Sequence, residues 1–122
     1  MDHKKRTWLY CRIDAPEDTH GVLKGQKREL TDYAEQMGFI VVGESEDIGS
    51  GLDSDRPGLA EVMKAAGDGR MDVLLVKKVD RLGRDTAKLL EFLRGLDQLG
   101  VELYSPLEGQ IQLDYRSPSL SL

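Results

Sequence analysis

The sequence predicts an α/β domain with a doubly wound, mostly parallel sheet of four to five strands and helices on both faces. Short apolar runs alternate with amphipathic segments in the order β-α-β-α-β-α-β along a chain of 122 residues. The connections between runs are long enough for the crossovers that parallel strands require. One run, the Val-Leu-Leu-Val of residues 73–76, contains no polar residue, which is typical of a central strand covered on both faces.

The first half of the chain predicts two strands around one helix. Residues 7–13 are rich in aromatic and β-branched side chains and predict a strand, with Trp8 and Tyr10 packing at the sheet margin. Apolar residues then recur at helical spacing, namely Leu23, Leu30, Ala34 and Met37. A second strand is expected over residues 39–43. Residues 45–58 contain three glycines and one proline and predict a long loop, a kind of segment that often carries function.

The second half predicts two more helices and two or three strands. Pro57 suits the first turn of a helix, and an apolar stripe follows it: Leu59, Val62, Met63 and Ala66. The uninterrupted strand is expected over 72–79, a helix over 86–99, a strand over 101–105 and a candidate fifth strand over 110–113. We therefore expect one domain over residues 1–114 and a loose carboxyl-terminal tail over 115–122.

Composition excludes several classes of protein. The formal charge of −5 and a pI near 5.0 argue against a module that coats nucleic acid through bulk charge. No apolar run approaches the ~20 residues that cross a bilayer, so we expect no membrane partner. Cys11 is the one cysteine and there are two histidines, so we expect neither a disulfide nor a metal site. A cytoplasmic location is the corresponding expectation.

Cationic residues nevertheless gather where the predicted strands end. Residues 77–88 hold five cationic and two acidic side chains. In doubly wound sheets, ligands bind at the carboxyl ends of the strands. The polar residues expected there are Arg12, Asp14, Asp47, Arg56, Lys77, Lys78, Asp80, Arg81 and Arg84. Guanidinium groups suit phosphate oxygens, which predicts a phosphate or phosphodiester site. Structural ion pairing with Asp47, Asp80 and Asp85 is the alternative, and spacing alone leaves both open.

Five segments together resemble the catalytic domain of the resolvase/invertase serine recombinases. They are Tyr10-Cys-Arg-Ile-Asp14, Gln26 with Leu30, Asp47-Ile-Gly-Ser-Gly51, Arg56-Pro-Gly-Leu59 and Val76-Lys-Lys-Val-Asp-Arg-Leu-Gly-Arg-Asp-Thr-Ala87. The resemblance covers residues 7–105. It implies a fold of the kind predicted above, DNA as the partner, and assembly into homo-oligomers among full-length relatives. It implies no cofactor and no metal ion.

The resemblance also implies a chemistry. In this family a serine hydroxyl after the first strand attacks a DNA phosphodiester, forms a 5′-phosphoserine link and releases a 3′ hydroxyl. Arginines at the positions of Arg12, Arg56, Arg81 and Arg84 hold the scissile phosphate. Asp80, Gln26 and Asp47 would support that site.

Two departures from the family pattern bear on activity. The nucleophile position holds Asp14 in place of serine, and we expect its carboxylate to act as an internal anion beside the arginines. The sequence also ends at Leu122, without the dimerisation helix and helix-turn-helix domain of the family, either because it is a piece of a longer chain or because the protein is a remnant. We therefore expect weak association or a monomer, and no reading of DNA sequence.

Three functions remain open at this stage. The first is a recombinase catalytic domain that is impaired or inactive. The second is a catalytically silent DNA-binding or regulatory remnant. The third is a phospho-acceptor receiver-like domain in which Asp14 and Asp80 supply the acids. A covalent DNA adduct, salt-sensitive DNA binding and Mg²⁺-dependent phosphorylation would distinguish them.

Overall fold

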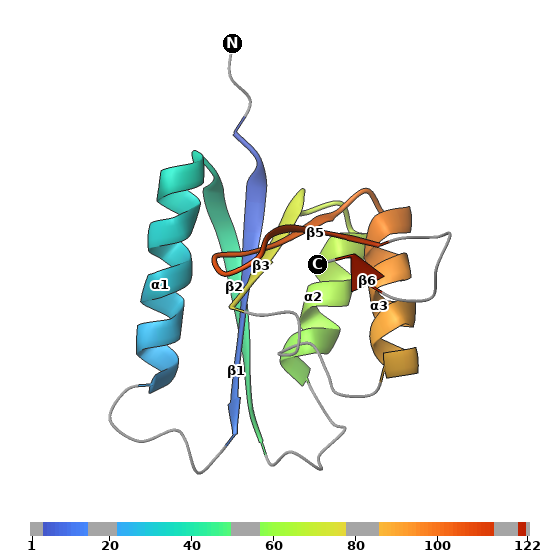
Figure 1. The fold of residues 1–122 in the computed structure, drawn as a ribbon, viewed down its shortest axis with the longest axis horizontal. Helices are drawn as coiled ribbons and strands as arrows, with labels where there is room; N and C mark the ends of the chain where they lie inside the picture. The colour runs from blue at the N-terminus through green and yellow to red at the C-terminus, as the bar shows by residue number, and fades with distance from the viewer. Residues whose placement is uncertain (1–3, 15–21, 50–56, 78–85, 114–119, 122) are drawn as a thin grey trace.

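A central sheet separates one helix from two others in the computed structural model of the chain (Figure 1). The structure describes residues 4–14, 22–49, 57–77, 86–113 and 120–121. The strands lie in the order β2-β1-β3-β4-β5-β6. Their bounds are Arg6–Asp14 for β1, Ile40–Gly49 for β2, Val73–Val76 for β3, Glu102–Ser105 for β4, Gly109–Leu113 for β5 and Leu120–Ser121 for β6.

Most of the strand pairs are parallel. β1 pairs in parallel with β2 and β3, and β3 pairs in parallel with β4. β5 returns antiparallel to β4, and the two-residue β6, inside the segment expected to be a loose tail, runs antiparallel to β5. The predicted doubly wound, mostly parallel α/β fold is confirmed.

The helices cover opposite faces of the sheet. α1, Val22–Met37, packs on one face, where Leu30 and Ala34 contact Leu9, Cys11 and Leu75. α2, Pro57–Gly67, and α3, Thr86–Gln98, cover the other face. Their apolar side chains form one cluster with residues of the strands, including Trp8, Tyr10, Val62, Leu74, Leu93 and Leu96. Successive residues of β1 therefore alternate between the two cores, as a covered strand requires.

The predicted margin position of Trp8 and Tyr10 is wrong. β1 lies between β2 and β3, and both rings pack in the core that α2 and α3 cover, with 4% and 0% of their surface exposed. Met37, one of the apolar residues at helical spacing, lies in the last turn of α1 and is 44% exposed. For Trp8 and Tyr10, the position of β1 inside the sheet, rather than side-chain type, decides burial.

β2 is longer than predicted. It continues to Gly49, so residues 45–49 belong to the strand rather than to a loop. The register between β1 and β2 shifts by one residue between Thr7 and Trp8. Thr7 pairs with Val41, whereas Trp8 pairs with Gly43. Beyond this bulge the side chains of β2 alternate between exposed and buried. Glu44 and Glu46 are exposed, and Ser45 and Asp47 are buried. β3, in contrast, stops at Val76, before the predicted end at residue 79.

Ion pairs join the amino ends of the strands. Arg6 donates through its guanidinium and its backbone N–H to the carboxylate of Asp72, and Lys5 pairs with Glu102. The hydrogen bond from the Arg6 side chain holds the pKa of Asp72 below its usual value. Among the residues that the structure describes, no helix has the length and apolar character to cross a bilayer.

Candidate active site

The candidate site lies where β1 and β2 end. Their register pairs Arg12 with Asp47 and Asp14 with Gly49, so both strands reach the same edge. β3 stops earlier, at the pair of Tyr10 with Val76. Of the predicted site residues, the structure describes the side chains of Arg12, Gln26, Asp47 and Lys77 and the backbone of Asp14. Arg56, Asp80, Arg81 and Arg84, as well as Lys78, lie outside the described residues.

Arg12 is held from the α1 side through its backbone. Its N–H donates a hydrogen bond of 3.2 Å to Oε1 of Gln26. Gln26 is 4% exposed and Arg12 is 9% exposed. Because Arg12 lies beyond the last β1–β3 pair, the Gln26 amide satisfies a strand N–H at a point where β3 has already ended. Strand alternation places the Arg12 side chain on the face of Tyr10, which α2 and α3 cover.

Asp47 is held by three donors from two elements. The Tyr10 hydroxyl donates to its Oδ2 at 2.7 Å. The backbone N–H groups of Gly58 and Leu59 donate to Oδ1 at 2.8 Å and to Oδ2 at 3.0 Å. These N–H groups belong to the first turn of α2, which has no partners for them within the helix. A carboxylate is favoured there because it accepts these bonds and meets the positive end of the helix dipole.

The sequence Pro57-Gly58 suits this contact. Proline at the first helical position lacks an N–H that the helix could not have satisfied internally. A Cβ added to Gly58 would lie 2.4 Å from the carbonyl oxygen of Glu46 and 3.0 Å from Cγ of Asp47. The start of α2 therefore rests directly on the backbone of β2, and a side chain at residue 58 would separate the two.

Two further residues of β1 and β2 contribute contacts that sequence reasoning missed. The Trp8 indole N–H donates to Oγ of Ser45 at 2.8 Å, and the Ser45 hydroxyl donates to Glu61 of α2 at 2.6 Å. Tyr10 was likewise not among the predicted site residues. No local sequence signal marks these positions, because the segment Glu44–Asp47 is polar at every residue.

The other face of the sheet shows structural ion pairing. Lys77, a predicted site cation, lies 3.8 Å from Glu29 of α1, a carboxylate that is not among the ion-pair partners predicted for it. Lys27 pairs with Glu46 at 2.6 Å and with Glu44 at 3.4 Å, and the hydrogen bond to Glu46 raises the pKa of Lys27. These cations are therefore held by carboxylates of the chain itself.

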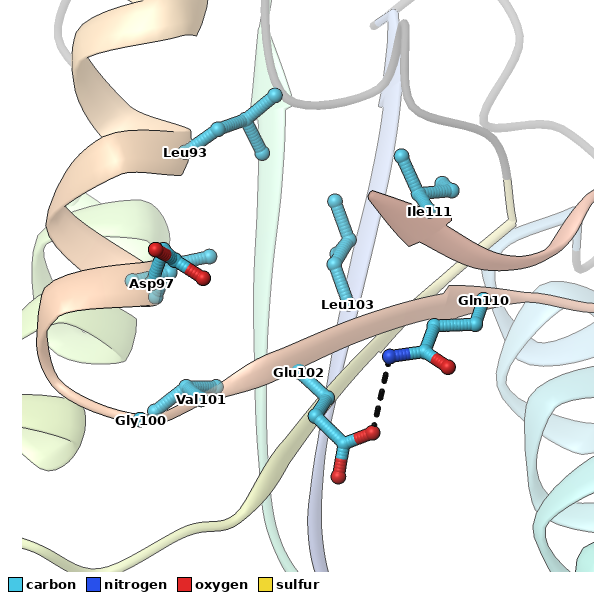
Figure 2. Close-up of a pocket in the computed structure, with 9 residues that line it drawn as sticks. Leu93, Asp97, Gly100, Val101, Glu102, Leu103, Gln110 and Ile111 are labelled. Carbon is cyan, nitrogen blue, oxygen red and sulfur yellow. Dashed lines mark hydrogen bonds between the residues drawn. The ribbon is translucent and has the colours of Figure 1, made fainter. Parts of the chain in front are cut away.

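Two of the hollows among the described residues are not lined by Arg12. One of about 380 Å³ beside β2 is lined by three carboxylates and one ammonium, which disfavours a phosphate. Another of about 370 Å³ lies between α3 and β4–β5 (Figure 2). There, Gln110 Nε2 donates to Glu102 at 3.0 Å. Glu102 begins β4, so this hollow is at the amino edge of the sheet, opposite the ends of β1 and β2.

Cys11 is not a nucleophile in the described structure. It is 1% exposed within the α1 core, and burial raises the pKa of its thiol to about 12. Among the residues described, no group of three or more His, Cys, Asp and Glu side chains is arranged to hold a metal ion. The chemistry available at the described edge is therefore that of Arg12 and of the hydrogen bonds around it.

Comparison with known proteins gives the family. The sequence model of "Resolvase, N terminal domain" matches residues 7–121. Transposon Tn3 resolvase of Escherichia coli is 46% identical over 96 residues, which cover 79% of this chain and 47% of the resolvase. The chain thus spans about half the length of this curated relative.

Solved structures show the same likeness. The catalytic domain of ISC1926 TnpA, an IS607-like serine recombinase, superposes with a TM-score of 0.74 at 31% identity, covering 82% of this chain and 68% of that one. The amino-terminal catalytic domain of TP901-1 integrase gives a TM-score of 0.75 at 27% identity, covering 86% of this chain and 79% of that one.

Proposed function

The chain belongs to the resolvase family of serine recombinases, and on that premise we propose that the carboxyl edge of its sheet binds a DNA phosphodiester. Arg12, Arg56, Arg81 and Arg84 would hold the phosphate, while Asp80, Gln26 and Asp47 would support them. The observation that carries the proposal is the meeting of three residues at one edge of the sheet. The backbone of Arg12, two residues before Asp14, is hydrogen-bonded to Gln26 and pairs in register with Asp47.

The arginines would act electrostatically. A guanidinium stays protonated and offers a planar fork of donors that fits phosphate oxygens. Fixed cations placed where negative charge develops on the phosphoryl group lower the barrier to its transfer. Burial of Arg12 beside a structured strand end favours such fixation, because the residue has little freedom to reorganise.

An aspartate at residue 14 changes which steps of strand exchange this site could carry out. A serine hydroxyl that attacks phosphorus loses its proton, forms an O–P bond and expels the 3′ oxygen, which takes up a proton. The same attack by a carboxylate would form an acyl phosphate, which hydrolyses readily and so would not preserve the bond needed for religation. The negative charge of the carboxylate also opposes the approach of a phosphodiester. We therefore propose that the chain binds DNA phosphates but does not complete serine-type strand exchange.

DNA binding tests the proposal directly. A fluorescein-labelled duplex is titrated with the chain at several salt concentrations, and binding is followed by anisotropy. Each arginine–phosphate contact contributes roughly 0.9 to the slope of log affinity against log salt. Arg81→Ala is expected to weaken binding and reduce that slope by about one contact. Arg94→Ala is the matched control, because Arg94 is exposed on α3. Equal losses for the two variants would contradict a defined site.

Covalent chemistry is tested separately. The chain and its Asp14→Ser variant are incubated with supercoiled DNA that carries the cognate recombination site, and adducts stable to detergent are sought. No adduct is expected for the natural sequence. An adduct in Asp14→Ser, attached through residue 14, would show that the arginine site is intact. An adduct in the natural chain would overturn the assignment of Asp14 as a blocked position.

A silent regulatory role is the second candidate, and Asp14 is the observation that favours it. In that role the chain binds DNA phosphates or joins an active relative, with weak association or none between its own copies. The receiver-like alternative is not supported, because the family match covers residues 7–121.

A further inference from the structure

The sheet has an open, apolar edge at the amino-terminal end of β2. β2 is the outermost strand, and no other strand of the described chain lies beyond it. Ile40, Val41 and Val42 are 47%, 39% and 41% exposed. Because successive side chains of a strand point to opposite faces, three exposed residues in a row show that neither face is fully covered here. Proteins often protect such an edge with charged residues or proline, and these three positions carry neither.

The backbone of Val41 offers hydrogen-bonding groups on this open side. The N–H of Ile40 donates to the carbonyl oxygen of Lys5 at 3.0 Å, so the backbone of residue 40 faces β1. In a parallel ladder, alternate residues turn their N–H and C=O groups to opposite sides, so those of Val41 face away from β1. A strand of another molecule pairs with such groups when it adds to a sheet edge.

Farther along the same edge, β2 borders the hollow of about 380 Å³, which we call the acidic hollow. It is lined by Lys27 of α1, by residues 44–46 of β2 and by the first part of α2 as far as Glu61. It therefore opens between the two helix layers, at the edge itself. Its three glutamates and one lysine leave two net negative charges. Lys27 is paired with Glu46 and Glu44, whereas no cation among the described residues pairs with Glu61, which accepts the Ser45 hydroxyl.

The charge of the acidic hollow distinguishes between possible occupants of the edge. A nucleic acid is repelled by its net negative charge. A second copy of the chain would bring the same glutamates to the edge, on a molecule whose formal charge is −5. An extended segment with basic residues at one end and β-branched residues at the other matches both halves of the edge. Cross-strand pairs of β-branched side chains and of opposite charges each stabilise such pairing.

We propose that the free edge of β2 binds an extended segment of a partner protein, basic at one end and β-branched at the other, as an added strand. The β-branched residues lie against residues 40–42, and lysines or arginines lie at the acidic hollow beside Glu61. In antiparallel addition the basic residues come first, because β2 runs from its apolar half to its acidic half. The proposal is independent of DNA binding, since it uses none of the residues assigned to the phosphate.

A synthetic strand tests the proposal on the full chain. The probe is a fluorescein-labelled, end-capped peptide, Lys-Lys-Lys-Thr-Val-Ile-Val, whose lysines would lie opposite residues 44–46. It is titrated with the chain at about 50 mM salt, where charge interactions are only partly screened, and binding is followed by anisotropy. A peptide with glutamates in place of the three lysines is the control for charge. Amide hydrogen exchange of the chain is recorded with and without saturating lysine peptide.

Saturable binding of the lysine peptide is expected, with binding of the glutamate peptide at least ~10-fold weaker, because like charges opposite one another disfavour pairing. In the complex, exchange of the Val41 N–H should slow at least ~10-fold, because that group gains a partner. The N–H of Ile40 is already bonded to Lys5, so its exchange should change less than about threefold.

Two pairs of variants separate the backbone contact from the charge. Val41→Pro removes the outward N–H at a position where an edge strand tolerates proline, and should weaken peptide binding at least ~10-fold. Val41→Thr keeps the N–H and the branched shape and should bind within about threefold. Glu61→Gln keeps an acceptor for the Ser45 hydroxyl but removes the charge, and should weaken binding about threefold to fivefold. Glu91→Gln, at an exposed position of α3, is its matched control and should bind like the natural chain.

Several outcomes would overturn the proposal. They are absence of saturable binding by the lysine peptide, equal binding of the glutamate peptide, and unchanged exchange at Val41 in the complex. Equal affinities of folded Val41→Pro and Val41→Thr would likewise exclude strand addition at this edge. If circular dichroism shows that Val41→Pro is unfolded, the exchange at Val41 and the comparison of Glu61→Gln with Glu91→Gln decide the matter.

Discussion

A methyl group at residue 43 is expected to destabilise the fold more than its size suggests. Gly43 pairs with Trp8 across β1 and β2, and the Trp8 ring lies over it. A Cβ at this position would lie 2.2 Å from Cζ3, 2.5 Å from Cε3 and 2.6 Å from Cη2 of the indole. Carbon atoms ordinarily pack at about 3.5–4.0 Å, so the ring would have to move by roughly 1.3 Å or more.

The cost of that movement follows from what the indole contacts. Overpacking in a close-packed core costs about 1–3 kcal/mol. The indole N–H would also lose its 2.8 Å bond to Ser45, worth about 1 kcal/mol. Arg70, whose guanidinium carbon lies 5.3 Å from the ring centroid, would lose part of its contact as well. We expect Gly43→Ala to lower the free energy of unfolding by about 2–4 kcal/mol, or the melting temperature by roughly 10 °C.

Urea unfolding followed by tryptophan fluorescence measures this change, since Trp8 is the one tryptophan of the chain. Gly25→Ala is the control, because a Cβ there meets nothing within 4 Å in the helix α1. That variant should be stabilised by up to about 1 kcal/mol, because alanine favours the helix. The reasoning is refuted if Gly43→Ala unfolds at the same urea concentration as the natural chain with unchanged Trp8 emission.

Three further outcomes are expected. Cys11 in the folded chain should react with a thiol reagent at pH 8 at least ~100-fold more slowly than in denaturant, since burial raises its pKa to about 12. The lowered pKa of Asp72, caused by the hydrogen bond from Arg6, adds stability above the unfolded-chain pKa of about 3.9. That small contribution of a part-exposed pair is lost as the pH falls through the lower folded-state pKa, so urea midpoints of Asp72→Asn and the natural chain should converge in acid. Leu75→Ala, at a fully buried site in the α1 core, should cost about 2–5 kcal/mol by calorimetry; a loss below ~1 kcal/mol would contradict the packing.

The sequence was sufficient to predict elements whose burial is apolar. The run at residues 73–76 is buried at every position because β3 is covered on both faces. Val62 and Ala66 lie in the core as their spacing predicts. β2 could not be predicted beyond residue 43 by the same reasoning, because its buried positions hold Ser45 and Asp47. Polar residues occupy those positions because Trp8, Tyr10 and α2 supply partners, and nothing local in the sequence specifies such distant partners.

The residues of the candidate site likewise fall into those that the sequence identified and one that it did not. Gln26 and Asp47 were identified by resemblance to a family, and the structure adds the contacts they make. Tyr10 was missed because an aromatic residue in an apolar strand predicts only packing. Its hydroxyl acquires a role through β2, which is adjacent in the sheet but distant along the chain.

The contacts around the end of β1 also bear on what a change at residue 14 requires. α1 is tied to β1 through the backbone N–H of Arg12, and α2 is tied to β2 through the carboxylate of Asp47. Both ties form with any residue at position 14, because neither uses its side chain. If residue 14 is the nucleophile position, as proposed, its exchange would therefore alter the chemistry without demanding a change in these two contacts. On this reasoning Asp14→Ser should retain the melting temperature of the natural chain to within a few degrees; a large fall would show that these contacts depend on the carboxylate.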